Sequence, residues 1–119
     1  MDNYSSLDFV FGALADPTRR AVVQRLGRGP ASVKELAAPF HMALPSFMKH
    51  IAVLEQSGLV RSQKVGRVRT CSMEPKLLRT AEAWMAEQRA LWEARTDRLA
   101  DFVEGFRTNL EEKRDGRSE

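Results

Sequence analysis

The sequence is poor in the residues that build disulfide frameworks, metal clusters and membrane spans. It has one cysteine and two histidines among 119 residues, so it can form neither an internal disulfide nor a cysteine cluster. No apolar run approaches the ~20 residues that a bilayer-spanning helix needs, and residues 1–6 lack the basic flank and apolar stretch of a secretory signal. We therefore expect one small domain in a reducing cytoplasm, with no membrane partner.

Signatures of metal sites and of enzymes are also missing. The candidate ligands for a soft metal are His41, His50 and Cys71, which fall on different predicted elements without an i, i+4 histidine pair or a CxxC motif. The chain has no GxSxG, no phosphate-binding glycine loop and no HExxH. We expect no cofactor and no catalytic site, and Cys71 is most simply a small apolar residue of a strand.

The basic charge is concentrated in one part of the chain. Residues 1–74 carry ten basic and six acidic side chains, whereas residues 75–119 carry nine and ten. The whole net charge of +3 therefore comes from the first two thirds. This split predicts one part that meets a polyanion and a second part with another task.

Three helices are predicted before residue 40. Asp16 is a good N-cap, and Pro17 suits the first position of a second helix that ends at Leu26. Residues 32–35 (SVKE) form a capping box that begins a short third helix, which stops before Pro39. The opening helix is amphipathic, with apolar side chains at the spacing i, i+3, i+4, i+7: Leu7, Val10, Phe11 and Leu14.

A fourth helix is predicted from residue 44 or 45 to Ser57, where Gly58 stops it. Two short helices joined by a tight turn predict a helix-turn-helix, whose second helix enters the DNA major groove. The apolar stripe Phe47, Ile51 and Leu54 turns inward. The outward faces then carry the candidate DNA contacts Pro45, Ser46, Met48 and Lys49, with Ala52 at the edge.

The side chains of this face differ in what they offer to DNA. Lys49 can reach a guanine edge or a phosphate, whereas Met48 gives at most apolar contact, for instance with a thymine methyl group. For His50 two interpretations have equal weight: a DNA contact, or a partly buried histidine that bonds to backbone between helices. His41 lies in the predicted turn and is expected to face solvent.

A basic hairpin follows the fourth helix directly. Residues 60–65 and 68–73 predict two strands joined by a two-residue turn at residues 66–67. A wing directly after the second helix favours DNA binding over the protein-only uses of helix-turn-helix folds. The wing's candidate contacts with the DNA backbone or minor groove are Lys64, Arg67 and Arg69.

The last predicted helix is too long for the rest of the chain to cover. From residue 75 to 113 it would be roughly 55–60 Å long, whereas a body of residues 1–74 would be roughly 25 Å across. A second copy of the chain is the expected partner for its apolar stripe. The predicted dimer interface consists of Leu7, Val10, Phe11, Trp84, Leu91, Trp92, Leu99, Phe102 and Phe106.

The sequence resembles the ArsR/SmtB family of bacterial winged-helix repressors over about residues 7–73. The resemblance is carried by residues 14–20 (LADPTRR), 33–37 (VKELA), 44–51 (LPSFMKHI), 53–60 (VLEQSGLV) and 66–67 (GR). Trp84, Arg89, Trp92-Glu93 and residues 97–99 resemble a subgroup without a metal site, whose members are often encoded beside small hydrophobic-pocket proteins of the START-like type.

The resemblance implies a homodimer that represses a promoter by occupying an inverted repeat. It places residues 45–50 on the recognition helix and Arg67 at the wing tip. Two departures are Ala43, where the subgroup usually has a serine N-cap, and Met48, which replaces another serine on the DNA face. Residues 35–39 lack the cysteine motif that binds metal in the founding members, so metal response is not expected.

The combined prediction is a mainly α, dimeric winged helix-turn-helix with a small β-hairpin, forming one domain over residues 1–119. Residues 16–73 would bind double-stranded DNA, residues 1–15 and 75–113 would form the dimer, and residues 114–119 would fray. Two alternatives stay open. The chain could be a protein-interaction adaptor with little DNA affinity, or a repressor that binds a small apolar effector near Trp84 and Trp92.

Overall fold

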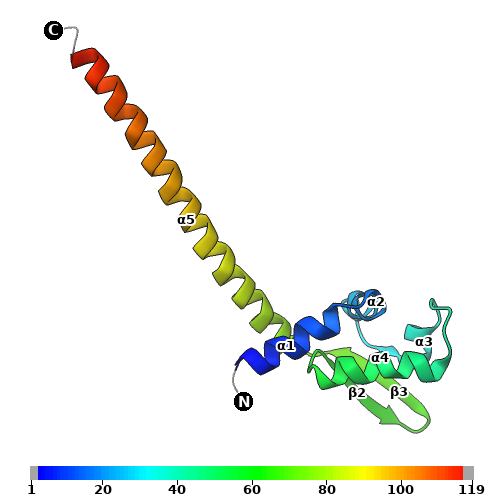
Figure 1. The fold of residues 1–119 in the computed structure, drawn as a ribbon. Coiled ribbons are helices and arrows are strands. Elements are labelled where there is room, and N and C mark those ends of the chain that lie inside the picture. Colours follow the sequence, from blue (N-terminus) through cyan, green and yellow to red (C-terminus); the bar gives the residue numbers. More distant parts are fainter. Residues whose placement is uncertain (1–2, 117–119) are drawn as a thin grey trace. The chain divides into compact units, whose positions relative to one another are not determined.

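The computed structural model describes residues 3–116 of the chain. It divides into two compact units, one up to Glu82 and one from Ala83 onward. The elements (Figure 1) are α1 (Asn3–Leu14), α2 (Pro17–Leu26), β1 (Ala31–Ser32), α3 (Val33–Ala37), α4 (Leu44–Gln56), β2 (Val60–Val65), β3 (Val68–Met73) and α5 (Pro75–Gly116).

The helices begin where the sequence predicts. Asp16 caps α2, because its carboxylate accepts a hydrogen bond of 3.0 Å from the backbone N–H of Arg19. Ser32 and Glu35 form the predicted capping box of α3: the Glu35 N–H donates to the Ser32 hydroxyl, and the Ser32 N–H donates to the Glu35 carboxylate. Helix α4 begins after Ala43 without a side-chain cap, as its missing hydroxyl predicts.

The sheet has three strands in the order β1-β3-β2, all antiparallel. The hairpin β2-β3 covers the predicted residues, with Val65 opposite Val68 beside the turn. Gly66 has a φ of +64° there, a conformation that favours glycine. Strand β1, which pairs Ala31 with Cys71, was not predicted, since two residues show no alternation of apolar and polar side chains.

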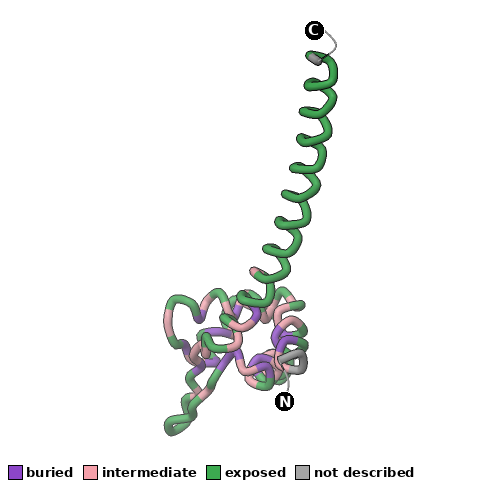
Figure 2. Tube along the Cα trace, turned by 90° about the vertical axis from the view of Figure 1, so that its left-hand side faces the viewer, coloured by how far each residue is buried: buried purple, intermediate pink, exposed green. Residues whose placement is uncertain are grey.

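One hydrophobic core lies in the unit up to Glu82, between the helices and the sheet (Figure 2). The predicted inward stripe of α4 is confirmed, because Phe47, Ile51 and Leu54 are at most 1% exposed. Leu7 and Val10 require a correction. Both are buried in the core of one chain, so they leave the predicted dimer interface. Their apolar spacing predicts a buried face but cannot tell an intrachain partner from a second copy.

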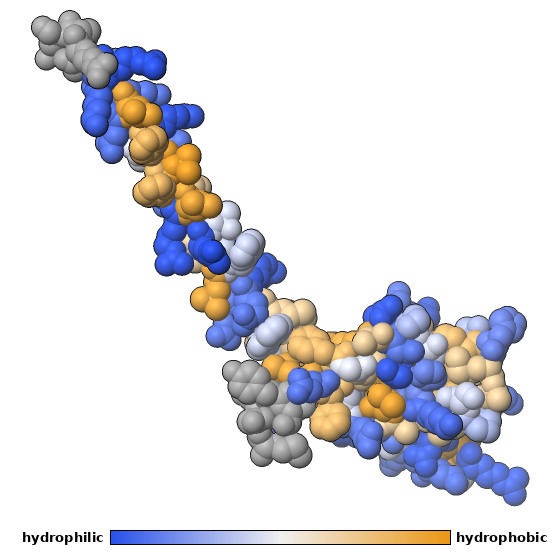
Figure 3. Space-filling model, in the orientation of Figure 1, coloured by the Kyte–Doolittle hydropathy of each residue, from blue (hydrophilic) through white to orange (hydrophobic). Residues whose placement is uncertain are grey.

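Helix α5 extends to Gly116, three residues beyond the predicted end at Lys113. Residues 114–116, which are predicted to fray, are the last residues of this helix, and residues 117–119 lie outside the described part. From Trp84 onward its large apolar side chains are exposed, and Figure 3 shows apolar atoms gathered along the helix. No helix among residues 3–116 is both long and apolar enough to cross a membrane.

Candidate nucleic-acid interface

The outward face of α4 is set by the stripe that its other face buries. With Phe47 and Ile51 in the core, the exposed positions include Pro45, Ser46 and Lys49, as the helical spacing predicts. The Lys49 side chain forms no ion pair or hydrogen bond within the described residues. This face therefore offers a cation, a hydroxyl and small apolar groups to a partner.

Met48 takes a position between core and surface. Its side chain is half-buried and packs against the core cluster, so only part of it is available to a ligand. It borders a groove between α4 and the hairpin, together with Leu44 and Val68, which are 56% and 53% exposed. Exposed apolar side chains that meet in a concave surface are typical of a binding site.

His50 is held by two residues of the α2 N-terminus. Its Nδ1 lies 3.1 Å from the Arg19 guanidinium and 3.6 Å from the Asp16 carboxylate. Because arginine only donates, Nδ1 is the acceptor of this hydrogen bond when the ring is neutral. The half-buried histidine thus bonds between helices, as one of the two interpretations expects, although its partner is a side chain rather than backbone.

Arg19 connects three helices. Its guanidinium donates to the carbonyl oxygens of Ala13 at 2.8 Å and Gly12 at 3.2 Å, near the end of α1, and it also bonds to His50 on α4. Planar, multiply hydrogen-bonded guanidinium groups fix geometry in a way that lysine cannot. Arg19 therefore sets the position of α4 relative to α1 and α2.

Replacing Arg19 by lysine should weaken DNA binding without removing a DNA contact. We expect Arg19→Lys to lower affinity about fivefold to tenfold, because the loss of hydrogen bonds lowers the free energy that holds α4 in position by about 1–1.4 kcal/mol. The dependence of the affinity on salt should stay unchanged, since no phosphate contact is lost. Fluorescence anisotropy over a salt series measures both quantities. A flatter salt dependence would show that Arg19 itself contacts phosphate.

Asp16 is an acid with a lowered pKa. The main cause is the hydrogen bond from the backbone N–H of Arg19, and the charges of His50 and Arg19 lower the pKa further. A folded pKa below the ordinary 3.8 means that the ionised carboxylate stabilises the fold. This contribution is fully present above the ordinary pKa and is lost as the pH falls through the lowered value.

Replacing Asp16 by asparagine should separate the cap from the charge. Asparagine keeps a capping oxygen, so we expect Asp16→Asn to lower the free energy of unfolding by only about 0.3–1 kcal/mol near pH 7. The difference from the parent should vanish as the pH falls through the lowered pKa of Asp16. Urea denaturation at several pH values measures it, with the exposed Asp101→Asn as the matched control. A difference that grows toward low pH would contradict this account.

The basic residues of the hairpin fall into two groups. Lys64 and Arg67, beside and within the turn, are exposed and form no side-chain ion pair or hydrogen bond in the described part of the chain. Arg69 is half-buried and donates to the Ser62 hydroxyl at 2.9 Å. Of the predicted wing contacts, Lys64 and Arg67 are therefore free to meet an anion, whereas Arg69 also holds the hairpin.

Ser62 links this hairpin to α4. Its hydroxyl donates to the Glu55 carboxylate near the end of α4, while it accepts from Arg69 on β3. Arg61, one residue earlier, pairs with Glu74. These contacts compensate two of the four hairpin cations and leave the free positive charge at the tip.

A groove joins the two parts of the interface. Its volume is about 840 Å³, and residues of α3, α4, the connection between them and the hairpin line it. We call it the wing groove and define it by four cations and four apolar side chains: Lys34, Lys64, Arg67, Arg69, Phe40, Leu44, Met48 and Val68.

The structure adds residues that sequence reasoning missed. Arg19 was noted only within the family motif, and Lys34 and Leu44 were not assigned to the interface. The signal for Lys34 and Leu44 was present, since both border the helix-turn-helix turn. Arg19 offered no such signal, because its partners are backbone oxygens on another helix.

The candidate metal ligands do not come together. His41 is exposed, His50 is held by Arg19, and Cys71 is buried on β3. No three His, Cys, Asp or Glu side chains within residues 3–116 are grouped to hold a metal ion. Burial raises the pKa of the Cys71 thiol, and the nearby Glu55 raises it further, so the thiol is kept neutral.

Residues 14–63 match a family described as a helix-turn-helix domain. The regulator Rv2034 of Mycobacterium tuberculosis is 40% identical over 75 residues, which cover 63% of this chain and 70% of that protein. A solved ArsR family transcriptional regulator, RHA00566, is 63% identical with a TM-score of 0.73, over 75% of this chain and 92% of the other. The chain belongs to the ArsR family. This ArsR protein is a DNA-binding transcriptional regulator and not an enzyme.

A further relative of this ArsR protein is the transcriptional repressor SdpR of Bacillus subtilis. It is 29% identical over 76 residues, which cover 64% of this chain and 84% of that protein. The resemblance seen in the sequence is thereby confirmed, together with the winged helix-turn-helix fold. In this fold α3 and α4 form the helix-turn-helix and the β2-β3 hairpin is the wing.

Proposed function

We propose that this ArsR protein is a repressor that binds an inverted-repeat operator in double-stranded DNA as a homodimer. Each α4 would enter a major groove, with half-sites about 34 Å apart. The observation that carries the proposal is the free cations, Lys49 on α4 and Lys64 and Arg67 at the wing tip. A regulator that occupies chromosomal DNA would act in the cytoplasm.

The proposed contacts differ in their roles. Lys49 would contact a guanine edge or a phosphate, and Pro45, Ser46 and the exposed part of Met48 would lie against the bases. Lys64 and Arg67 would contact the DNA backbone or the minor groove. Arg69 and His50, which have internal partners, would mainly position the wing and α4.

The dimer is supported by the exposed face of α5. Its large apolar side chains are 38–72% exposed from residue 84 onward, and monomeric proteins rarely expose a contiguous apolar patch of this extent. On a helix with 100° per residue these side chains fall on one side. They are Trp84, Met85, Leu91, Trp92, Leu99, Phe102, Val103, Phe106 and Leu110.

Substitution of the free cations tests the DNA contacts. We expect Lys49→Ala and Arg67→Ala each to weaken binding to the DNA upstream of the protein's own gene. The slope of log affinity against log salt should fall by about one unit for each lost phosphate contact, hence about two per dimer. If Lys49 reads a guanine, its variant should instead lose sequence preference, by about 1–3 kcal/mol per half-site.

Lys113→Ala serves as the control, since it removes one exposed cation near the end of α5. It should leave affinity and slope unchanged. If Lys49→Ala and Arg67→Ala both bind like the parent at every salt concentration, the assigned contacts are wrong. If the parent binds all DNA weakly and without sequence preference, the adaptor alternative gains support.

A further inference from the structure

The wing groove combines cations, which suit DNA, with an exposed apolar wall, which phosphates do not require. Its four cations suit phosphates, but Leu44 and Val68 at its wall are more than half exposed to solvent. The phosphate groups of DNA offer no apolar partner to such side chains, and apolar side chains that stay in water contribute no burial free energy. The pairing of a cationic rim with an apolar wall is complementary to an amphiphile with a negative head group.

The charge balance of the groove supports an anionic ligand. No Asp or Glu lines it, and the Lys34, Lys64 and Arg67 side chains have no ion pair among the described residues. Arg69 is the exception, because Ser62 connects it to Glu55. Three uncompensated cations therefore surround one concave surface.

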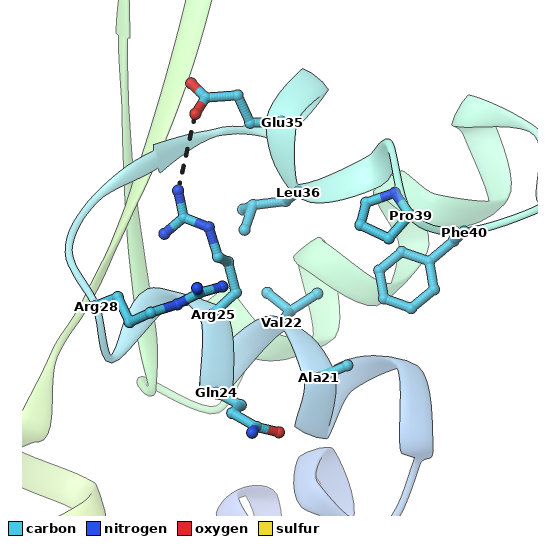
Figure 4. A pocket seen from close by; sticks show the side chains of 9 residues that line it. All are labelled: Ala21, Val22, Gln24, Arg25, Arg28, Glu35, Leu36, Pro39 and Phe40. Carbon is cyan, nitrogen blue, oxygen red and sulfur yellow. Dashed lines mark ion pairs between the residues drawn. The ribbon is translucent and has the colours of Figure 1, made fainter.

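A second hollow carries less net positive charge than the wing groove. It has a volume of about 690 Å³ and lies between α2 and α3 (Figure 4). Its wall carries Arg25 and Arg28, but Glu35 lies 3.8 Å from Arg25 and compensates that charge. The second hollow therefore keeps one uncompensated arginine, Arg28, whereas the wing groove has three uncompensated cations.

We propose that the wing groove binds a free medium-chain fatty carboxylate that competes with DNA. The carboxylate would bind between Lys64 and Arg67, and the alkyl chain would lie along Leu44, Met48 and Val68. A volume of about 840 Å³ is ample for such a molecule. The regulatory part of this inference rests on the proposed function, because Lys64 and Arg67 are also the proposed DNA contacts.

A free amphiphile fits better than a membrane surface. The alkyl contacts lie on the wall of a concave groove formed by two elements, α4 and the hairpin. A bilayer would need these side chains on a protruding face, where they could insert between headgroups. Binding to anionic vesicles without binding of the free carboxylate would therefore contradict the proposal.

Isothermal titration calorimetry with the intact protein and dodecanoate, well below its critical micelle concentration, tests the site directly. We expect saturable binding that butyrate and dodecyltrimethylammonium do not reproduce, since one lacks the chain and the other the negative charge. Leu44→Gln/Val68→Thr should weaken dodecanoate binding at least fivefold. Val65→Thr, a matched change on the same hairpin outside the groove lining, should alter it less than twofold.

Competition then connects the site to regulation. Dodecanoate should release DNA from the parent, whereas DNA bound to Leu44→Gln/Val68→Thr should resist release, relative to that variant's own DNA affinity without dodecanoate, since its cations are intact. The proposal would be wrong if the double variant bound dodecanoate as tightly as the parent does. It would also be wrong if the fluorescence of Trp84 and Trp92, which both lie on α5, changed in step with dodecanoate binding, because the ligand would then bind on α5. A parent that binds dodecanoate but no DNA would instead refute the proposed function and leave the ligand site standing.

Discussion

Replacing Phe47 by alanine should lower the free energy of unfolding by about 3–5 kcal/mol. Phe47 is fully buried in the first turn of α4, and its ring packs against that of Phe40 with a centroid distance of 5.6 Å. Truncation removes most of the ring's burial and leaves a cavity that the surrounding helices can fill only in part. The free energy of unfolding of a small domain is about 5–15 kcal/mol, so this substitution would remove a large share of the stability.

The same substitution should abolish operator binding at temperatures where the variant is partly unfolded. The cause is indirect, because the side chain that is removed faces away from the proposed DNA surface. Urea denaturation followed by circular dichroism measures the stability, and Leu44→Ala on the same helix is the control. Leu44 is 56% exposed, so its truncation should cost less than about 1 kcal/mol. Equal losses for both variants would contradict the assignment of the core.

Features that depend on neighbouring residues were predictable from the sequence. The N-cap at Asp16, the capping box at residues 32–35 and the hairpin with its turn at residues 66–67 each follow from a few adjacent side chains and backbone angles. The inward stripe of α4 follows from its helical period. These predictions are confirmed because each feature depends on interactions between residues that are close together in the sequence.

Features that depend on distant partners were not predictable. Strand β1 exists only because Ala31 and Ser32 find partners on β3, about 40 residues further on. Burial of Leu7 and Val10 in their own chain, instead of at a dimer interface, depends on how α1 packs. The spacing of apolar residues predicts that one face of a helix is buried, but not whether the same chain or a second copy buries it.

The residues of the proposed interface were also predictable only in part. Lys49 and Arg67 were assigned from their places on the recognition helix and at the turn, and both are exposed and free of internal partners in the described residues. The tethering of Arg69 by Ser62 and of His50 by Arg19 joins side chains that are 7 and 31 residues apart. Spacing on one element cannot show such contacts, so the division into DNA contacts and positioning residues needs the structure.

Introducing two negative charges on the apolar side of α5 should have the largest effect on DNA binding. Phe102 and Phe106 are 72% and 61% exposed in the single chain, and the proposed dimer would bury them. A buried, unpaired carboxylate costs several kcal/mol, and each substitution occurs twice in a homodimer. We therefore expect Phe102→Glu/Phe106→Glu to be a monomer, with a mass near 13.5 kDa in sedimentation instead of twice this value.

Operator affinity should fall by about two orders of magnitude or more in this variant. A dimer that holds one half-site presents its second recognition helix at a high effective concentration, and a monomer loses this advantage. Binding to a single half-site should change far less, because α4 and the wing are untouched. The comparison of full and half operators therefore separates loss of pairing from loss of the DNA surface.

Ala100→Glu/Thr108→Glu is the matched control for charge. At 100° per residue these two positions lie on the side of α5 opposite Phe102 and Phe106, and both are exposed. The control adds the same two charges, so any general repulsion of DNA by α5 should appear in both variants. A dimeric Phe102→Glu/Phe106→Glu with undiminished operator affinity would show that α5 does not pair through this face. The long apolar stripe would then need a different partner, and two recognition helices would have to be held together by another surface.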